Sequence, residues 1–134
     1  MPHVTIQYTA NLDPEARMSE LCATLAEVIG AQRDAEGRRV FPLGGTRVLG
    51  YPAPVHAVAD GAVDRSFVYV NARIAPGRSA AVVAATGQAM LAALRSHFAE
   101  QFANRPLGIT LQIDEEAAAF DAKHSNLHPM FAGR

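Results

Sequence analysis

The residue with the most distinctive chemistry is Pro2, which follows the initiator methionine directly. Methionine is normally removed ahead of a small second residue, so we expect the mature chain to begin with proline. The nitrogen of an N-terminal proline is a secondary amine, and a terminal amine titrates at about pH 8. Burial in an apolar pocket, or nearby cations, would lower that pKa and leave a neutral amine, which is a competent general base.

A proline at the second position also arises by chance, because about 5% of residues in proteins are proline. The context of Pro2 favours the chemical interpretation. The segment His3–Thr9 alternates apolar and polar side chains, which predicts a β-strand that starts almost at the terminus. Chain ends usually fray, whereas a strand in this position would hold the Pro2 nitrogen inside the fold.

The rest of the first half predicts one helix and one extended stretch. Apolar residues fall at helical spacing from Glu15 to about Arg33, with Asp13 as a candidate N-cap and Pro14 as the first helical residue. A shorter extended stretch then runs from Val40 to about Tyr51.

The second half repeats this order. Phe67–Ile74 predicts a strand, Ser79 a helix N-cap, Ala80–Phe102 a long helix, and Leu107–Ile113 a further strand. A strand, a crossover helix and a parallel strand form a right-handed β-α-β unit.

Two such units side by side predict an α/β fold (α+β in some schemes), in which a small sheet carries both helices on one face. We expect residues 1–134 to form a single domain with pseudo-repeated halves, about 1–60 and 61–134. The other face of this sheet has no helix left to cover it. Such a face invites burial against copies of the same chain, which predicts an oligomer.

The charge and the cysteine content limit the classes of partner that this chain could bind. The net charge is −1, so no overall basic field exists to bind nucleic acid or an acidic membrane surface. The single cysteine, Cys22, excludes an intrachain disulfide, and neither a signal peptide nor a membrane-spanning run is present. We therefore expect a cytoplasmic protein in which any anion site is built from a few arginines.

Six motifs are spread through nearly the whole chain: Met1-Pro2-His3, Phe41–Arg47, Ala59–Gly61, Gly77–Ser79, His97–Ala99 and Asn126–Phe131. Together they resemble the 5-carboxymethyl-2-hydroxymuconate Δ-isomerases, a family of the tautomerase superfamily. The resemblance implies a tautomerase-like β-α-β repeat, assembled as a homotrimer with active sites at the subunit boundaries. It also implies that Pro2 is the catalytic base.

The same resemblance implies that Arg47 and Arg78 bind substrate carboxylates. The residues agree, because Arg78 precedes a predicted helix N-terminus, where backbone N–H groups favour an anion, and the planar fork of arginine suits carboxylates. Both cations near Pro2 would also disfavour its protonated form. The remaining arginines are expected to be solvated surface groups: Arg17, Arg33, Arg38, Arg39, Arg65, Arg95 and Arg105. Arg73 ends a strand and receives no role.

By resemblance, the activity is isomerisation of a carboxylate-bearing 2-hydroxymuconate-type dienol, as in homoprotocatechuate breakdown. The substrate would be a small di- or tricarboxylate, and the reaction needs no metal or organic cofactor. His3, His97 and His128 show no metal-ligand spacing, and His124 and His128, although four residues apart, lie in a polar, proline-containing tail that does not favour a metal site. We expect His128 and Phe131 to dock the tail on a neighbouring subunit. The stretch Gln32–Arg39 is longer than the corresponding family segment and should alter the rim of the pocket.

Two alternatives remain open. One is another activity of the superfamily, either phenylpyruvate-type tautomerisation or dehalogenation. Dehalogenation also needs a carboxylate that activates water, for which Glu115 and Glu116 are the candidates. The other alternative is a trimeric binding module without catalytic activity, because a fold does not guarantee an activity. A panel of substrates distinguishes the other superfamily activities from the isomerase. A biological effect that does not change when the N-terminus is blocked would favour the binding module.

Overall fold

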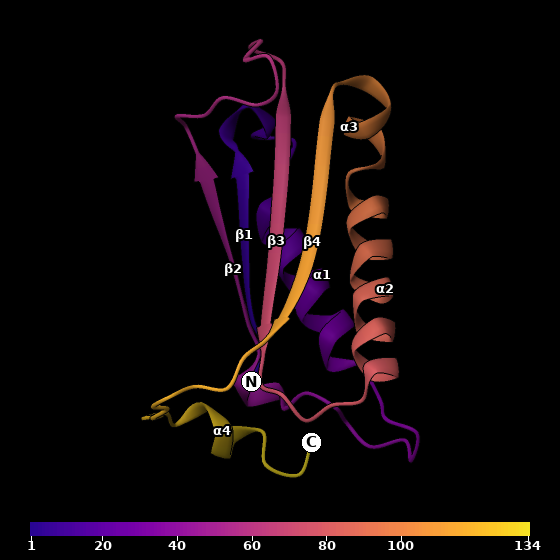
Figure 1. Cartoon of the computed structure of the whole chain (residues 1–134), viewed down its shortest axis with the longest axis vertical. Helices are drawn as coiled ribbons and strands as arrows, with labels where there is room; N and C mark the ends of the chain where they lie inside the picture. Colours follow the sequence, from indigo (N-terminus) through magenta and orange to yellow (C-terminus); the bar gives the residue numbers. More distant parts are fainter.

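The computed structural model describes residues 1–134 and contains one four-stranded sheet flanked by two long helices (Figure 1). The strands are β1 (His3–Thr9), β2 (Arg47–Ala53), β3 (Ser66–Ile74) and β4 (Leu107–Glu115). The helices are α1 (Met18–Gly30), α2 (Ala80–His97), α3 (Ala99–Asn104) and α4 (Leu127–Met130), with 3-10 turns η1 (Ala10–Leu12) and η2 (Leu43–Gly45).

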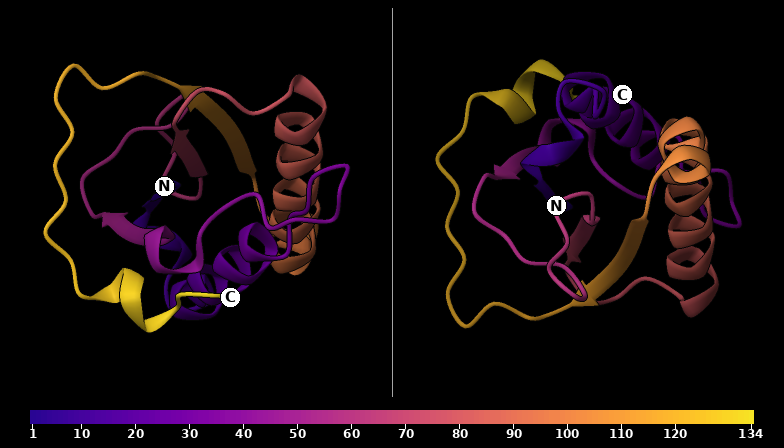
Figure 2. Two further views of the ribbon diagram at one scale, coloured as in Figure 1. Left: turned by 90° about the horizontal axis from the view of Figure 1, so that it is seen from below. Right: turned by 90° about the horizontal axis from the view of Figure 1, so that it is seen from above.

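The strand order is β2-β1-β3-β4. β1 pairs in parallel with β2, and β3 pairs in parallel with β4, while the central β1–β3 pair is antiparallel. Each parallel pair is joined through a helix, which confirms the predicted tandem β-α-β units. Figure 2 shows that α1 and α2 lie on the same side of the sheet, as expected.

The core lies between this helical layer and the sheet. Alternate residues of β1 and β3 point toward the helices and are fully buried, and they meet one apolar stripe from each long helix. These residues are Val4, Ile6, Val68 and Val70 from the sheet, and Leu21, Leu25, Met90 and Leu94 from the helices.

No helix covers the other face of the sheet. On this face Tyr69 donates a hydrogen bond to Gln112 at 2.6 Å, and Asn71 donates one to Asp114 at 2.7 Å. The chain after β4 passes on this side and ends in α4, near the end of the sheet where the N-terminus lies (Figures 1 and 2).

The predicted start of the first helix is wrong. Asp13 and Pro14 lie in a turn, and α1 begins at Met18 after Arg17, whose φ of 45° is left-handed. Asp13 is occupied elsewhere, because its carboxylate accepts a hydrogen bond of 2.9 Å from the Tyr8 hydroxyl. The helix also ends earlier than expected, at Gly30.

The second helix confirms one prediction and corrects another. Ser79 is the N-cap of α2, and its hydroxyl accepts a hydrogen bond from the Val82 N–H at 3.2 Å. The predicted helix over Ala80–Phe102 is interrupted at Phe98, which is fully buried. Beside it, the buried His97 ring is hydrogen-bonded at 2.7 Å to the Ala16 carbonyl, so tertiary contacts end α2 where the apolar pattern continues.

Candidate active site

Pro2 lies at the start of β1 on the helix-covered side of the sheet. It is buried and lines a small apolar cavity together with Phe41, Ile74 and Met90. Its carbonyl accepts a hydrogen bond of 3.0 Å from the Arg47 N–H, which joins it to the first residue of β2. The predicted strand therefore does hold Pro2 inside the fold. With Met1 attached, however, its nitrogen is an amide nitrogen and not a base.

The environment of the α-amino group disfavours positive charge. Burial is the main cause that lowers the pKa of this group from 8.0, and the positive charges of Arg78 and Lys123 lower it further. The carboxylate of Asp121 acts in the opposite direction. The end of the chain thus lies in a half-buried and mostly cationic setting.

Arg78 lies on the loop between β3 and α2, next to the N-terminus of α2. Its guanidinium donates hydrogen bonds to the carbonyls of Ala75 at 3.0 Å and Val40 at 3.4 Å. It also stacks 4.4 Å from the centre of the Phe41 ring. Burial lowers the pKa of Arg78, and its Nε atom is buried without a hydrogen-bond partner. Phe41 lines the cavity of Pro2 as well, so it connects the two predicted site residues.

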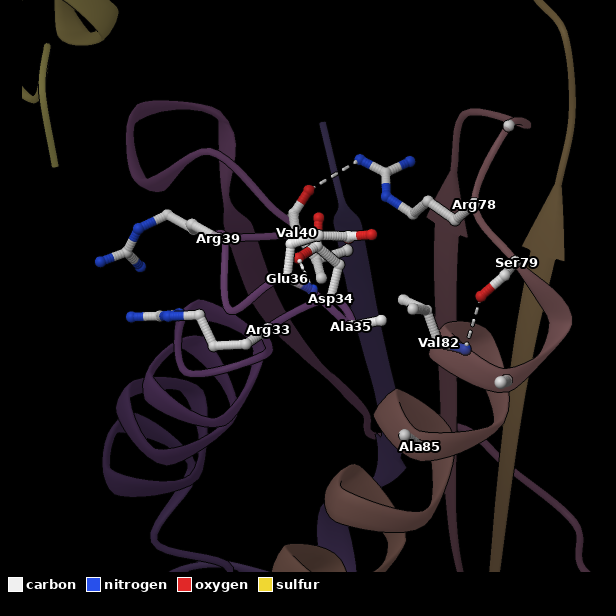
Figure 3. A pocket seen from close by; sticks show the side chains of 12 residues that line it. Arg33, Asp34, Ala35, Glu36, Arg39, Val40, Arg78, Ser79, Val82 and Ala85 are labelled. Carbon is white, nitrogen blue, oxygen red and sulfur yellow. Dashed lines mark hydrogen bonds between the residues drawn. The ribbon is translucent and has the colours of Figure 1, made fainter.

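A cleft of about 670 Å³ opens beside Arg78, between the loop that follows α1 and the start of α2. Figure 3 shows Arg78, Ser79 and Val82 on one side of this cleft, with Arg33 and Arg39 on the other, extending away from Arg78. Their guanidiniums both donate to the carbonyl of Gly30, the last residue of α1. The long loop does form the rim of a pocket, while its two arginines stabilise a helix C-terminus.

Arg47 lies on the opposite face of the sheet from Pro2. Its neighbour Val48 packs on the core, so strand alternation directs Arg47 to the uncovered face. One guanidinium nitrogen, Nη1, donates to the carbonyls of Gly44 at 2.8 Å and Thr46 at 3.0 Å. Arg47 therefore faces a separate pocket. Within one chain, the fold brings together Pro2 and Arg78 but not Arg47.

Several arginines expected to be solvated surface groups also make contacts that hold the structure together. Arg17 donates to the His97 carbonyl at 2.7 Å, and Arg105 donates to the Asn11 carbonyl at 3.0 Å. Arg65 forms ion pairs with Asp60 and Asp64, and Arg38 forms ion pairs with Asp34 and Glu36. Long side chains of this kind tie loops to the ends of helices and strands, a use that their spacing in the sequence does not reveal.

The two carboxylates considered for water activation lie at the end of β4 and directly after it. Glu116 is paired with Arg73 at 3.0 Å, which gives that unassigned arginine a partner. The charge of Glu115, at the end of β4, acts on Arg78 and opposes the effect of burial on the pKa of Arg78.

The sequence interpretation missed the C-terminal tail as part of this region. Lys123 and Asp121 form an ion pair and act on the α-amino group, and residues 124–127 face Arg47. The tail docks on its own chain, where α4 packs against η2. No local signal could have shown this contact, because it joins segments about 80 residues apart. That His128 and Phe131 also dock on a neighbouring subunit stays a prediction.

No group of three or more His, Cys, Asp or Glu side chains is placed so that it could hold a metal ion. No helix combines the length and the apolar character needed to cross a membrane.

Comparison with known proteins identifies the family. The model of the family described as 5-carboxymethyl-2-hydroxymuconate isomerase matches residues 2–131. The 5-carboxymethyl-2-hydroxymuconate Delta-isomerase of Escherichia coli is 27% identical over 131 residues, which cover 98% of this chain and 99% of that protein.

Solved structures agree. A crystal structure of a 5-carboxymethyl-2-hydroxymuconate delta-isomerase is 43% identical with a TM-score of 0.94, covering 100% of this chain and 95% of the other. A fused 4-OT, described as a symmetric trimer, shares the fold at 19% identity and a TM-score of 0.61, covering 98% of both chains. The family match spans nearly the entire sequence, so this chain belongs to the 5-carboxymethyl-2-hydroxymuconate isomerase family.

Proposed function

We propose that this isomerase moves a proton on a 2-hydroxymuconate-type dienol and that Pro2, exposed by removal of Met1, is the general base. The Pro2 nitrogen accepts the proton of the 2-hydroxyl group. The O–H electron pair then forms the C2=O bond, the conjugated double bonds shift, and a distal carbon takes up a proton from the prolinium. The amine is regenerated, so the step balances without a redox partner or cofactor.

The observation that carries this proposal is the setting of the chain terminus. Pro2 is buried beside an apolar cavity, and the α-amino group next to it already has a lowered pKa because of burial and Arg78. Removal of Met1 transfers the free amine to Pro2, into the same surroundings. The family of this chain is named for an isomerase of this substrate class.

The substrate class follows from the cations. The name 5-carboxymethyl-2-hydroxymuconate describes a molecule with three carboxylates, two from the muconate chain and one from the carboxymethyl group. Arg78 lines the cleft and is partly desolvated, so a carboxylate bound there would gain a charge-assisted hydrogen bond from its guanidinium. The proposed place in metabolism is the breakdown of aromatic acids related to homoprotocatechuate, which the family of this chain supports.

The position of Arg47 supports a homotrimer with shared sites. Arg47 and Pro2 lie on opposite faces of one sheet, which supports the proposal that a neighbouring chain supplies the Arg47 that meets the substrate at Pro2. Two features favour such packing: the sheet face without a helix layer, and the symmetric trimer described for the fused 4-OT of the same fold.

The decisive experiment is an ultraviolet assay with 5-carboxymethyl-2-hydroxymuconate on the mature protein and on Pro2→Ala. Loss of a general base typically costs 10²-fold or more in rate, so we expect kcat to fall by about that factor while KM changes little. A second preparation that retains Met1 should be equally inactive, because its Pro2 nitrogen is an amide.

Equal activity of the mature protein and Pro2→Ala would overturn the mechanism. If the mature protein does not turn over 5-carboxymethyl-2-hydroxymuconate, the function is either another activity of the superfamily or that of a binding module. A panel with phenylpyruvate enol and a halogenated acrylate then distinguishes the related tautomerase and dehalogenase activities from a binding module.

A further inference from the structure

The proposed function assigns no role to the C-terminal tail, which forms one side of the pocket in front of Arg47. The cavity measures about 550 Å³, and its lining consists of Arg47 and the four tail residues His124, Ser125, Asn126 and Leu127. The tail is thus the one segment that lines this pocket opposite Arg47. It lies there because the chain after β4 returns beneath the sheet (Figure 1).

The tail is held in this place by a close backbone contact. α4 packs on η2, the turn just before Arg47. A Cβ atom added to Gly44 would lie 2.9 Å from the His128 Cα and 3.2 Å from the His128 nitrogen. Real Cβ atoms do not approach backbone so closely, so this contact requires glycine at position 44.

The same glycine orients Arg47. The Gly44 carbonyl accepts a hydrogen bond of 2.8 Å from Nη1 of Arg47, while Gly44 also contacts the backbone of α4. One residue thus sets the position of the guanidinium and of the tail opposite it. The engaged Nη1 leaves the Nη2 and Nε atoms of Arg47 free for a ligand.

The tail presents free polar groups to this pocket. The Ser125 hydroxyl is engaged, because it accepts the Leu127 N–H at 3.0 Å. The Asn126 side chain makes no capping bond to α4, and neither it nor the His124 ring has a hydrogen-bond partner within the chain. Just before them, Lys123, the only lysine of the sequence, adds a positive charge near the chain terminus.

From this arrangement we propose that the C-terminal tail is the second wall of the Arg47 carboxylate site, where Asn126 and His124 donate hydrogen bonds to the carboxylate that Arg47 binds. A carboxylate can accept more hydrogen bonds than the free N–H groups of one arginine donate. The Asn126 amide and the His124 ring donate to the acceptor sites that remain. The inference rests on the proposed function in one respect, namely that the carboxylate belongs to the substrate of the isomerase.

Steady-state kinetics give the first test. Asn126→Ala and His124→Ala should each raise KM for 5-carboxymethyl-2-hydroxymuconate by about tenfold, as expected for a lost hydrogen bond to a charged group, with kcat nearly unchanged. Asn126→Asp should raise KM further, because a carboxylate then faces a carboxylate. His56→Ala is the matched control, since His56 is exposed on a distant loop, and it should leave both constants unchanged.

A binding test separates this inference from the catalytic proposal. trans,trans-Muconate carries two carboxylates but no enol hydroxyl, so it binds without reacting. Titration of the mature protein with this probe should shift the imidazole proton resonance of His124, identified by its absence in His124→Ala. Arg47→Ala should abolish the shift, and Gly44→Ala should weaken it, whereas Gly87→Ala, a substitution within α2, should not.

The outcomes are distinct. An active enzyme with unchanged KM in the tail variants and no His124 shift would overturn the role of the tail while leaving the isomerase proposal intact. A protein without isomerase activity that still shows the Arg47-dependent shift would overturn the proposed reaction and support the tail site.

Discussion

At the scale of single residues, the proposed reaction depends on how strongly the surroundings of the chain terminus disfavour the protonated amine. Burial and the cations Arg78 and Lys123 all destabilise a protonated amine there, and only Asp121 favours it. The amine is thus neutral at a lower pH than a free terminus. In the proposed mechanism Arg78 has two roles: it binds a substrate carboxylate, and its charge disfavours protonation of the base.

This predicts a pH dependence with a definite direction. The neutral amine is present above its pKa and is lost as the pH falls through it. The acidic limb of kcat/KM for the mature protein should therefore have its midpoint below 8.0, the ordinary value, and Arg78→Ala should move the midpoint up.

Because Arg78→Ala also weakens substrate binding, the same titration should be repeated through the rate of carbamylation of Pro2 by cyanate, which needs no substrate. Mass spectrometry distinguishes Pro2 from Lys123, the one other amine. An unchanged midpoint in the variant would contradict the electrostatic role of Arg78.

At the scale of elements, the start of α2 determines where Arg78 lies. Ser79 caps the helix immediately after Arg78, so the loop enters the helix in one conformation. The long helix then carries the apolar stripe that packs on the sheet. The local capping bond of Ser79 thus helps to fix the position of Arg78, the side chain that we propose binds substrate.

We predict that Ser79→Ala lowers the free energy of unfolding by about 1 kcal/mol, the usual value of a lost N-cap, as measured by urea denaturation. It should also raise KM modestly, because the Arg78 loop loses its anchor. Ser96→Ala, on the exposed side of the same helix, serves as control and should be nearly neutral. A Ser79→Ala protein as stable as the control would show that packing alone fixes the loop.

Local patterns predicted the elements well wherever one face of an element is buried. The alternation in His3–Thr9 located β1, and Ser79 was identified as a cap because its chemistry is local. The patterns failed at Asp13, Pro14 and Phe98. At Asp13 the carboxylate accepts a hydrogen bond from the Tyr8 hydroxyl and does not cap the helix. Beside Phe98 the His97 ring is hydrogen-bonded to the Ala16 carbonyl of a distant segment. Such tertiary contacts override helix preference. The tail opposite Arg47 was missed for the same reason.

At the scale of the molecule, the sheet has one face without its own cover. Leu49 and Tyr51 on β2 are 51% and 50% exposed, and across β1 from them Phe67 stacks on Tyr69 of β3. Apolar and aromatic side chains on one flat face gain stability when a second chain covers them. This face is where we expect the proposed trimer to form.

Leu49→Glu should therefore reduce the mass measured by size-exclusion chromatography with light scattering, from three times the 14.3 kDa chain toward a single chain. A buried carboxylate without a partner is strongly unfavourable. Val55→Glu is the control, because Val55 is 92% exposed on the loop after β2. A trimer that tolerates Leu49→Glu would place the interface elsewhere.

The convergence of both chain ends on one end of the sheet also limits what can be attached to this protein. A tag, reporter or additional domain on the N-terminus would convert the proposed base into an amide. A fusion at the C-terminus would extend from the segment that faces Arg47. The loop over residues 54–65, at the far end of the sheet (Figure 1), is the place where a label or an inserted domain leaves the chemistry intact. For the same reason, gene fusion in this lineage should be tolerated at internal loops and selected against at either terminus.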